Sequence, residues 1–205
     1  MTAATQRDRT LELLRHRGLM RLSDLPRHGI HPSTLSRLVE EGSIARRARG
    51  LYELADAEVT LGHSLAEIAV RVPKGVICLI SALQFHEITL QAPRSIWVAI
   101  GENDHKPKVT QLAVRFLHFG DTALQTGVET VTIDGVTVKI FSPAKTVVDC
   151  FRYRRIVGLD VALEALRLAL RTRRTTPNEI ARLARQLRIW TVLRPYLESA
   201  VADDT

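Results

Sequence analysis

The sequence has only two cysteines and no long apolar run. These two features argue against a disulfide-rich protein and against a membrane-spanning one. Cys78 and Cys150 lie inside apolar stretches, so we expect reduced core residues rather than a disulfide or a metal pair. No apolar stretch approaches the roughly 18 residues that a membrane span requires. Residues 1–9 are polar and lack the apolar segment of a signal peptide, which predicts a cytoplasmic protein.

Motifs for metal, phosphate and dinucleotide chemistry are also missing. The seven histidines are scattered without metal-ligand spacing, and the 11 glycines form neither a P-loop nor a dinucleotide motif. Asp134, Lys139, Lys145 and Asp149 could suggest a metal nuclease. However, an Asp-Gly turn explains Asp134 better, and Asp149 is expected either to cap its helix or to pair locally with Lys145 at i, i+4. We therefore expect no enzyme, no metal and no cofactor.

Lysine is scarce, with five among the 29 basic residues, and the remainder are arginine. Arginine suits bidentate contact with phosphate or guanine, although a GC-rich genome would produce the same bias. The net charge of +7 favours a polyanionic partner, although a protein can also be merely basic. Basic minus acidic residues give 10 − 6 = +4 for residues 1–55, 8 − 10 = −2 for 56–149, 10 − 3 = +7 for 150–190 and 1 − 3 = −2 for 191–205. Two basic segments therefore flank a nearly neutral middle.

The first basic segment has the pattern of three short helices followed by a hairpin. Helices are expected at residues 10–16, 22–28 and 32–41, and strands at 44–46 and 51–54. Pro32 suits the first turn of the third helix, and Leu35, Leu38 and Val39 are expected on its buried face.

The third predicted helix has a polar face, and a helix-turn-helix presents such a face to the major groove of DNA. Ser33, Ser36, Arg37 and Glu40 recur at i, i+3, i+4 and i+7. Ser33, Thr34 and Ser36 can reach phosphates or base edges, and Arg37 can pair with guanine. An ordinary amphipathic helix with a solvated face would show the same pattern.

Three arginines lie at or beside the tip of the predicted hairpin. Their position favours a DNA-binding helix over an ordinary amphipathic helix for the residues before them. Arg46, Arg47 and Arg49 lie within four residues, next to Gly50. They predict a wing that straddles the DNA backbone or enters a minor groove, where negative potential favours arginine. A charged run can also be a solvated loop. Three helices and an arginine-tipped hairpin within 55 residues favour a winged helix-turn-helix that binds double-stranded DNA.

Beyond residue 56 the pattern changes to a mixture of helices and strands. The predicted fold class is α+β, with a winged helix-turn-helix domain at residues 1–56 and an α/β domain with a small sheet and a helical tail at residues 57–205. Helices are expected at residues 64–72, 81–86, 143–151, 159–170 and from 177, and strands at 96–100, 113–119, 130–133 and 136–141. The Asp134-Gly135 pair predicts a tight hairpin between the last two strands.

Six arginines of the second basic segment lie at predicted helix ends and turns. They could extend the DNA footprint or contact a partner protein, or they could serve only solubility and favourable charge at helix C-termini. These residues are Arg152, Arg154, Arg155, Arg171, Arg173 and Arg174.

Two blocks of the chain resemble one protein family. The stretch at residues 14–54 looks like the N-terminal domain of AbiEi-family antitoxins, with matches at Gly42, Arg49, Gly50 and Tyr52. The later stretch SPAKTVVDCFRYRRIVGLDVALEALRLAL is similar to the family's SP-x-[KR]-T-x-x-D helix and the helix that follows. Its matching residues are Ser142, Pro143, Lys145, Thr146 and Asp149. The resemblance extends from about residue 11 to 196.

The resemblance implies a biological role. AbiEi-type proteins are antitoxins of type IV toxin–antitoxin systems, and their winged helix represses their own operon by binding inverted repeats in the promoter. Their C-terminal domain counters a nucleotidyltransferase-type toxin. Relatives also occur as stand-alone DNA-binding proteins, so a transcription factor with a sensing or partner-binding C-terminal domain is the alternative.

Overall fold

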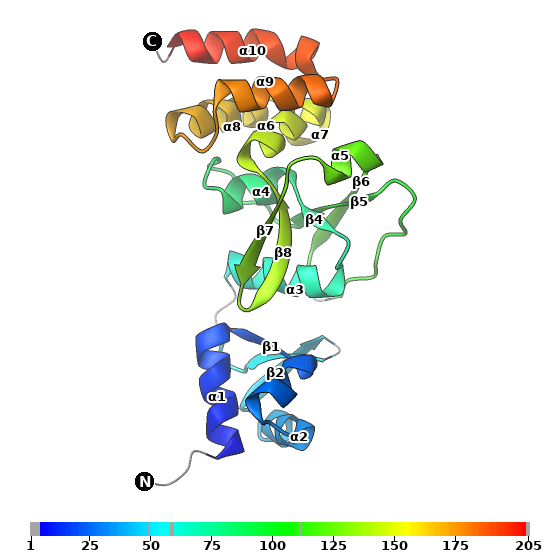
Figure 1. The fold of residues 1–205 in the computed structure, drawn as a ribbon, viewed down its shortest axis with the longest axis vertical. Coiled ribbons are helices and arrows are strands. Elements are labelled where there is room, and N and C mark those ends of the chain that lie inside the picture. The colour runs from blue at the N-terminus through cyan, green and yellow to red at the C-terminus, as the bar shows by residue number, and fades with distance from the viewer. Residues whose placement is uncertain (1–4, 49, 58–59, 111, 204–205) are drawn as a thin grey trace. The chain divides into compact units, whose positions relative to one another are not determined.

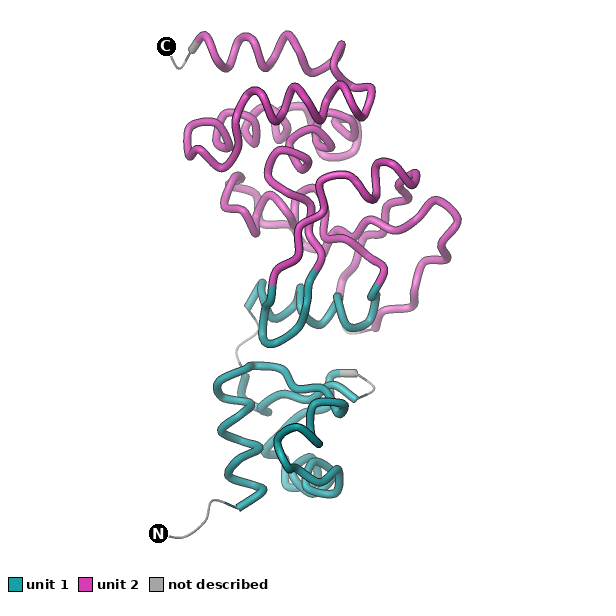
Figure 2. Tube along the Cα trace, viewed as in Figure 1, with its two compact units in different colours: residues 1–73, 132–138 teal, residues 74–131, 139–205 magenta. Residues whose placement is uncertain are grey.

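The computed structural model describes residues 5–48, 50–57, 60–110 and 112–203. The chain divides into two compact units (Figure 2). Unit 1 comprises residues 1–73 and 132–138, and unit 2 comprises residues 74–131 and 139–205. The predicted α+β class is confirmed, while the domain boundary after residue 56 stays a prediction.

Unit 1 begins with alternating short helices and strands (Figure 1). Its elements are α1 (Gln6–Arg17), β1 (Leu19–Arg21), the 3₁₀ helix η1 (Leu22–His28), α2 (Pro32–Glu40), β2 (Ile44–Ala48), β3 (Leu51–Leu54) and α3 (Leu61–Arg71). The three strands form an antiparallel sheet in the order β1-β3-β2. The predicted helices and hairpin are therefore present, and β1 is an element that the sequence pattern did not predict.

Local signals explain where α1 begins and ends. Thr5 and Asp8 form a reciprocal capping box at its start, which satisfies amide groups that have no partner inside the helix. Gly18 ends the helix at φ 71°, a conformation that glycine adopts without a steric penalty. The apolar side chains of α1 then pack with η1, α2 and β2 in a small core: Leu11, Leu14, Met20, Leu25, Ile30, Leu35, Leu38 and Ile44.

A five-stranded mixed sheet in the order β6-β5-β4-β8-β7 belongs mainly to unit 2, whereas residues 132–138, at the end of β7 and the start of β8, belong to unit 1. The strands are β4 (Val76–Ile77), β5 (Ile96–Gly101), β6 (Val114–Phe119), β7 (Val128–Ile133) and β8 (Val136–Phe141). β5 runs antiparallel to β4 and parallel to β6, and β4 runs parallel to β8. The hairpin between β7 and β8 turns at Asp134 and Gly135, whose φ angles of 50° and 71° are those of the predicted tight turn.

Helices complete unit 2 (Figure 1). They are α4 (Leu79–Phe85), α5 (Asp121–Gln125), α6 (Pro143–Arg152), α7 (Arg154–Val157), α8 (Leu159–Arg171), α9 (Pro177–Gln186) and α10 (Trp190–Asp203). α6 packs against α4, α8 and α9, and α10 packs against α9. Ser142 and Thr176 cap α6 and α9 through their side chains, and a proline follows each cap.

Candidate nucleic-acid interface

Helix α2 presents a polar face to solvent. Ser33, Ser36, Arg37 and Glu40 are exposed, whereas Leu35 and Leu38 are buried in the core of the N-terminal segment. The imidazole of His31 caps the helix by accepting a hydrogen bond from the amide of Ser33 at 3.3 Å. The predicted polar face is therefore exposed and begins at a capped helix N-terminus, where backbone amides favour anions such as phosphate.

Thr34 lies on the buried side of α2 rather than on the polar face. Its side chain is 6% exposed, and its hydroxyl donates a 2.9 Å hydrogen bond to Oε1 of Gln6 on α1. The same oxygen accepts a hydrogen bond of 3.1 Å from the amide of His31. Val39, expected in the core, is instead 36% exposed. Gln6 thus joins the starts of α1 and α2, and Thr34 positions the helix instead of facing a groove.

Arg37 is the cation of this face. Its side chain is 60% exposed and its Nε lies 3.6 Å from Oε1 of Glu41. Oε2 of the same carboxylate lies 3.5 Å from Nε of Arg7 on α1. Exposed ion pairs of this kind contribute about 0–1 kcal/mol, so Glu41 can release Arg37 to a nucleic acid at little cost.

The β2–β3 hairpin has a bulge at its arginines. The pairing passes from Arg46 opposite Tyr52 to Ala48 opposite Leu51, which leaves Arg47 as the extra residue. Arg46 is exposed. Gly50 has a φ of 72°, the positive φ that the sequence predicted for this turn. Arg49, the third predicted arginine of the tip, lies outside the described residues.

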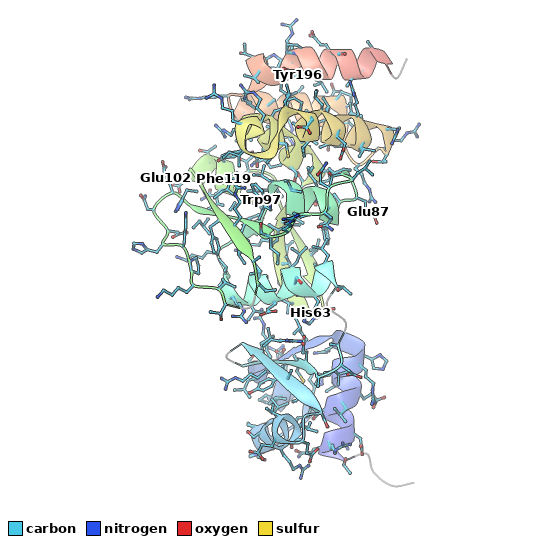
Figure 3. All side chains as sticks on the ribbon, turned by 180° about the vertical axis from the view of Figure 1, so that it is seen from behind. His63, Glu87, Trp97, Glu102, Phe119 and Tyr196 are labelled. Carbon is cyan, nitrogen blue, oxygen red and sulfur yellow. The ribbon has the colours of Figure 1, made fainter. Side chains whose placement is uncertain are left out.

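Arg47 turns toward a buried carboxylate on the neighbouring strand. Its Nε forms an ion pair with Oε1 of Glu53, whose side chain is fully buried. His63 lies at the first turn of α3 (Figure 3). Its Nε2 contacts the other oxygen of Glu53, and its Nδ1 lies 3.2 Å from Oδ2 of Asp134. Arg71 donates a hydrogen bond to the backbone oxygen of Arg47. The structure therefore places Arg47 in a polar cluster within unit 1, an arrangement that residue spacing did not predict.

The six predicted arginines of unit 2 lie in two groups near opposite ends of α8. Arg152 donates to the backbone oxygen of Leu187 at 3.3 Å, and Arg154 to that of Phe151 at 2.9 Å. Arg174 forms a 2.5 Å ion pair with the exposed Glu87. The other three, Arg155, Arg171 and Arg173, are exposed. Because the 13 residues of α8 span roughly 20 Å, the two groups do not form one compact patch.

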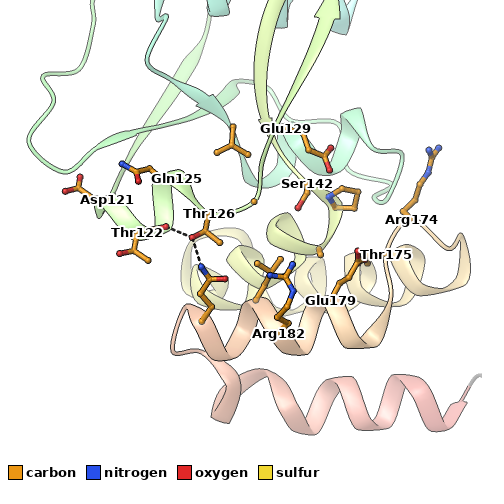
Figure 4. Close-up of a pocket in the computed structure, with 16 residues that line it drawn as sticks. Asp121, Thr122, Gln125, Thr126, Glu129, Ser142, Arg174, Thr175, Glu179 and Arg182 are labelled. Atoms are coloured by element: carbon orange, nitrogen blue, oxygen red, sulfur yellow. Dashed lines mark hydrogen bonds between the residues drawn. The ribbon is translucent and has the colours of Figure 1, made fainter.

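A polar hollow of about 760 Å³ lies in unit 2 (Figure 4). Arg174 and Arg182 line it together with three acidic side chains, Asp121, Glu129 and Glu179. One wall is held by the hydroxyl of Thr126, which donates to the backbone oxygen of Thr122 and accepts from the amide of Gln186. The mixed charge of its lining distinguishes this hollow from a simple anion site, and no sequence pattern predicted the hollow.

A buried ion pair lies in the core of unit 2. Nζ of Lys145 pairs with Oδ2 of Asp149, as the sequence predicts, and both side chains are fully buried. The ammonium group also lies 3.9 Å from the ring centroid of Phe141. Burial lowers the pKa of Lys145 and raises that of Asp149 to about 6, while the attraction between the two charges opposes both shifts. The pair belongs to the core, not to a solvent-accessible site.

The remaining titratable groups add no metal or redox site within the described part of the chain. Cys78 and Cys150 are free and buried, which confirms their prediction as core residues, and burial raises the pKa of both thiols. No group of three His, Cys, Asp or Glu side chains that could hold a metal ion occurs among the described residues. Nor does any helix in these ranges have the length and apolar character to cross a membrane.

Two known groups of proteins are similar to this chain: one family model matches its N-terminal segment, and one solved structure shares its fold. The family model described as "Transcriptional regulator, AbiEi antitoxin" matches residues 8–55, which confirms the predicted resemblance for this segment. No curated protein sequence matches the chain. A structure from Mycobacterium tuberculosis, "Crystal structure of RV2827C protein", matches with a TM-score of 0.59 and 15% sequence identity. The match covers 97% of this chain and 78% of that one, and at this identity it shows a shared fold.

Proposed function

We propose that the N-terminal segment is a winged helix-turn-helix that binds double-stranded DNA, and that the protein is a transcriptional regulator. The observation that carries this proposal is the exposed face of α2, formed by Ser33, Ser36 and Arg37, in the same unit as the hairpin with the exposed Arg46. The face offers hydroxyl groups and one guanidinium at the spacing of a recognition helix. The match of residues 8–55 to a family of transcriptional regulators supports the proposal.

The finer proposal is an autorepressor that also acts as an antitoxin. In this role the protein binds inverted repeats in its own promoter and counters a nucleotidyltransferase-type toxin of a type IV system in the cytoplasm. The support is the AbiEi description of the matching family and the Ser142-Pro143 block, which caps and begins α6. Residues 1–56 would form the DNA-binding domain and residues 57–205 the antitoxin domain, and neither would be an enzyme.

A stand-alone regulator with a sensing C-terminal domain is the second candidate. The hollow of about 760 Å³ in unit 2 favours it, because this volume lies within the roughly 300–1,000 Å³ of small-molecule sites. The neighbouring gene separates the candidates, since a nucleotidyltransferase encoded beside this chain supports the antitoxin. Divalent-metal-dependent cleavage of DNA by the purified protein would contradict both candidates in favour of a nuclease.

An electrophoretic mobility shift with the protein's own promoter, scanned for an inverted repeat, tests the DNA-binding proposal. Replacing Arg37 with alanine is expected to reduce the discrimination between promoter and scrambled DNA by about 1–3 kcal/mol, because a bidentate contact with guanine reads the base. Glu40→Ala, at the end of the same face, is the matched control and should keep this discrimination. If wild type and the Arg37 variant discriminate equally between promoter and scrambled DNA, α2 is not the recognition helix.

The exposed Arg46 of the hairpin is expected to contact phosphate rather than bases. Its replacement with alanine should weaken binding to promoter and scrambled DNA alike and lower the slope of log K against log salt by about 1. Measuring affinity from 50 to 200 mM salt for both DNAs tests this expectation. An unchanged slope would place the β2–β3 hairpin away from the DNA backbone.

A further inference from the structure

An exposed apolar groove runs along α8 in unit 2. It has a volume of about 490 Å³, and one of its walls is the side chain of Leu90, which is 84% exposed. Its lining residues are Leu90, Asp160, Leu163, Glu164, Arg167, Leu168 and Arg171. A single exposed leucine is common on protein surfaces, but an exposed apolar patch that several side chains form together marks a surface for another polypeptide.

The segment that carries Leu90 is tied to α8. Oε1 of Glu164 accepts hydrogen bonds of 2.8 Å from both the hydroxyl of Thr89 and the amide of Leu90. These two bonds hold the Leu90 backbone beside the helix while its side chain remains exposed. The groove is therefore preformed, which lowers the entropy lost when a partner binds.

The apolar surface continues beyond the groove toward the start of α8. Leu159, the first residue of the helix, is 38% exposed, and Ile156 on α7 is 45% exposed. Leu159 lies one turn before Leu163 on the same side of α8, and with Leu90 these two residues form an interrupted apolar strip, which we call the α8 strip. Its flanking charges, Asp160, Arg167 and Arg171, take part in no ion pair within the described residues.

The residues of the α8 strip are arranged so that the strip complements itself. When two identical helices pack antiparallel about a two-fold axis, residues equally distant from the axis face each other. An axis between residues 163 and 164 places Asp160 opposite Arg167 of the other copy, and Arg167 opposite Asp160. We propose that the α8 strip is the interface through which two copies of this chain form a symmetric dimer.

A second copy fits this surface better than another partner does. A partner with charge of one sign would meet both Asp160 and Arg167, which lie about 10 Å apart along the helix, so one of the two contacts would be repulsive. The opposite order of the two charges on an antiparallel copy satisfies both. One helix face and one loop residue form an interface at the small end of the known range, which predicts a reversible dimer that depends on concentration.

This proposal goes beyond DNA binding, because it requires no nucleic acid and involves only unit 2. The test is sedimentation velocity of the full chain without DNA over a range of micromolar concentrations. Wild type is expected to move from monomer to dimer as the concentration rises. Asp160→Arg and Arg167→Asp should each weaken self-association by at least about tenfold, because each places like charges opposite one another.

Mixing the two variants makes the test specific. In a mixed pair the Asp160→Arg chain carries two facing cations and the Arg167→Asp chain carries two facing anions, so the equimolar mixture should regain the dimer that each variant lost. Glu102→Arg and Lys108→Asp, which change exposed charges elsewhere in unit 2, are the matched controls and should associate like wild type. Circular dichroism checks that every variant is folded.

Leu90→Ser provides a second measurement that does not alter α8. Because the side chain is 84% exposed, the substitution should leave the melting temperature unchanged while weakening the dimer severalfold. A wild-type chain that stays monomeric at every concentration, or a mixture that fails to associate although both variants are folded, would overturn the proposal. A dimer that is insensitive to all three substitutions would place the interface elsewhere and would overturn it equally.

Discussion

Replacing Asp149 with alanine is expected to lower the free energy of unfolding by about 3–5 kcal/mol, because the substitution leaves the ammonium group of Lys145 buried without its counter-charge. Both side chains of this pair are fully buried, so water cannot compensate for the loss. Oδ1 of Asp149 has no hydrogen-bond partner within the described residues. The ion pair with Lys145 is therefore the main interaction that offsets the cost of burying the carboxylate. Denaturant unfolding followed by circular dichroism measures the effect.

Replacing both partners is the control for this prediction. Lys145→Met with Asp149→Leu keeps the volume of the site and removes both charges, so it should restore most of the stability that Asp149→Ala loses. If the double variant is as unstable as the single one, the loss comes from packing around α6 rather than from an unpaired charge.

The pH dependence gives a second check on the same pair. Burial raises the pKa of Asp149 from 3.8 to about 6, so the folded state holds this proton more tightly than the unfolded state. The contribution of protonation to stability is therefore complete below about pH 4 and is lost as the pH rises through about 6. Asp149→Asn lacks this titration, so the stability of wild type relative to the variant should fall across that window. A constant difference would contradict the assigned shift.

Replacing Arg47 with alanine is expected to destabilise unit 1 by about 2 kcal/mol, because the buried carboxylate of Glu53 would lose the guanidinium that pairs with it. The effect is smaller than for Asp149 because the side chain of Arg47 is 34% exposed, and solvent screens part of its attraction to Glu53. Thermal unfolding of the full chain measures this loss of stability as the shift of the melting temperature between wild type and Arg47→Ala.

A double variant separates a structural role of Arg47 from a contact with DNA. Arg47→Ala with Glu53→Gln removes the cation and the buried charge together and should recover most of the melting temperature. If Arg47 acts mainly inside the polar cluster, the double variant should also keep the wild-type salt dependence of DNA binding. A lower salt slope in the double variant, at wild-type stability, would return Arg47 to the DNA contacts that its position in the hairpin predicted.

Features that depend on neighbouring residues in the chain were predictable. The polar face of α2 follows from the 3.6-residue period, and the turn at Asp134 and Gly135 from the backbone conformations that these residues adopt. Strand β1 was missed because three residues carry too little pattern, and its pairing with β3 depends on residues about 30 positions away. Thr34 was misplaced for a similar reason, since its partner Gln6 lies 28 residues earlier in the chain.

By itself, the sequence determined most of the helices, the β2–β3 hairpin, the excess of arginine and most of the residues that α2 presents to solvent, because periodicity and capping act over a few residues. Tertiary structure decided what surrounds each charge. The i, i+4 spacing predicted that Lys145 and Asp149 pair, but only the packing of α6 among α4, α8 and α9 buries the pair and raises the pKa of Asp149. Likewise, the hairpin pattern located Arg47, but the buried Glu53 and the position of His63 turn it inward. Burial and long-range contacts depend on how distant segments pack, and residue spacing along the chain does not encode that packing directly.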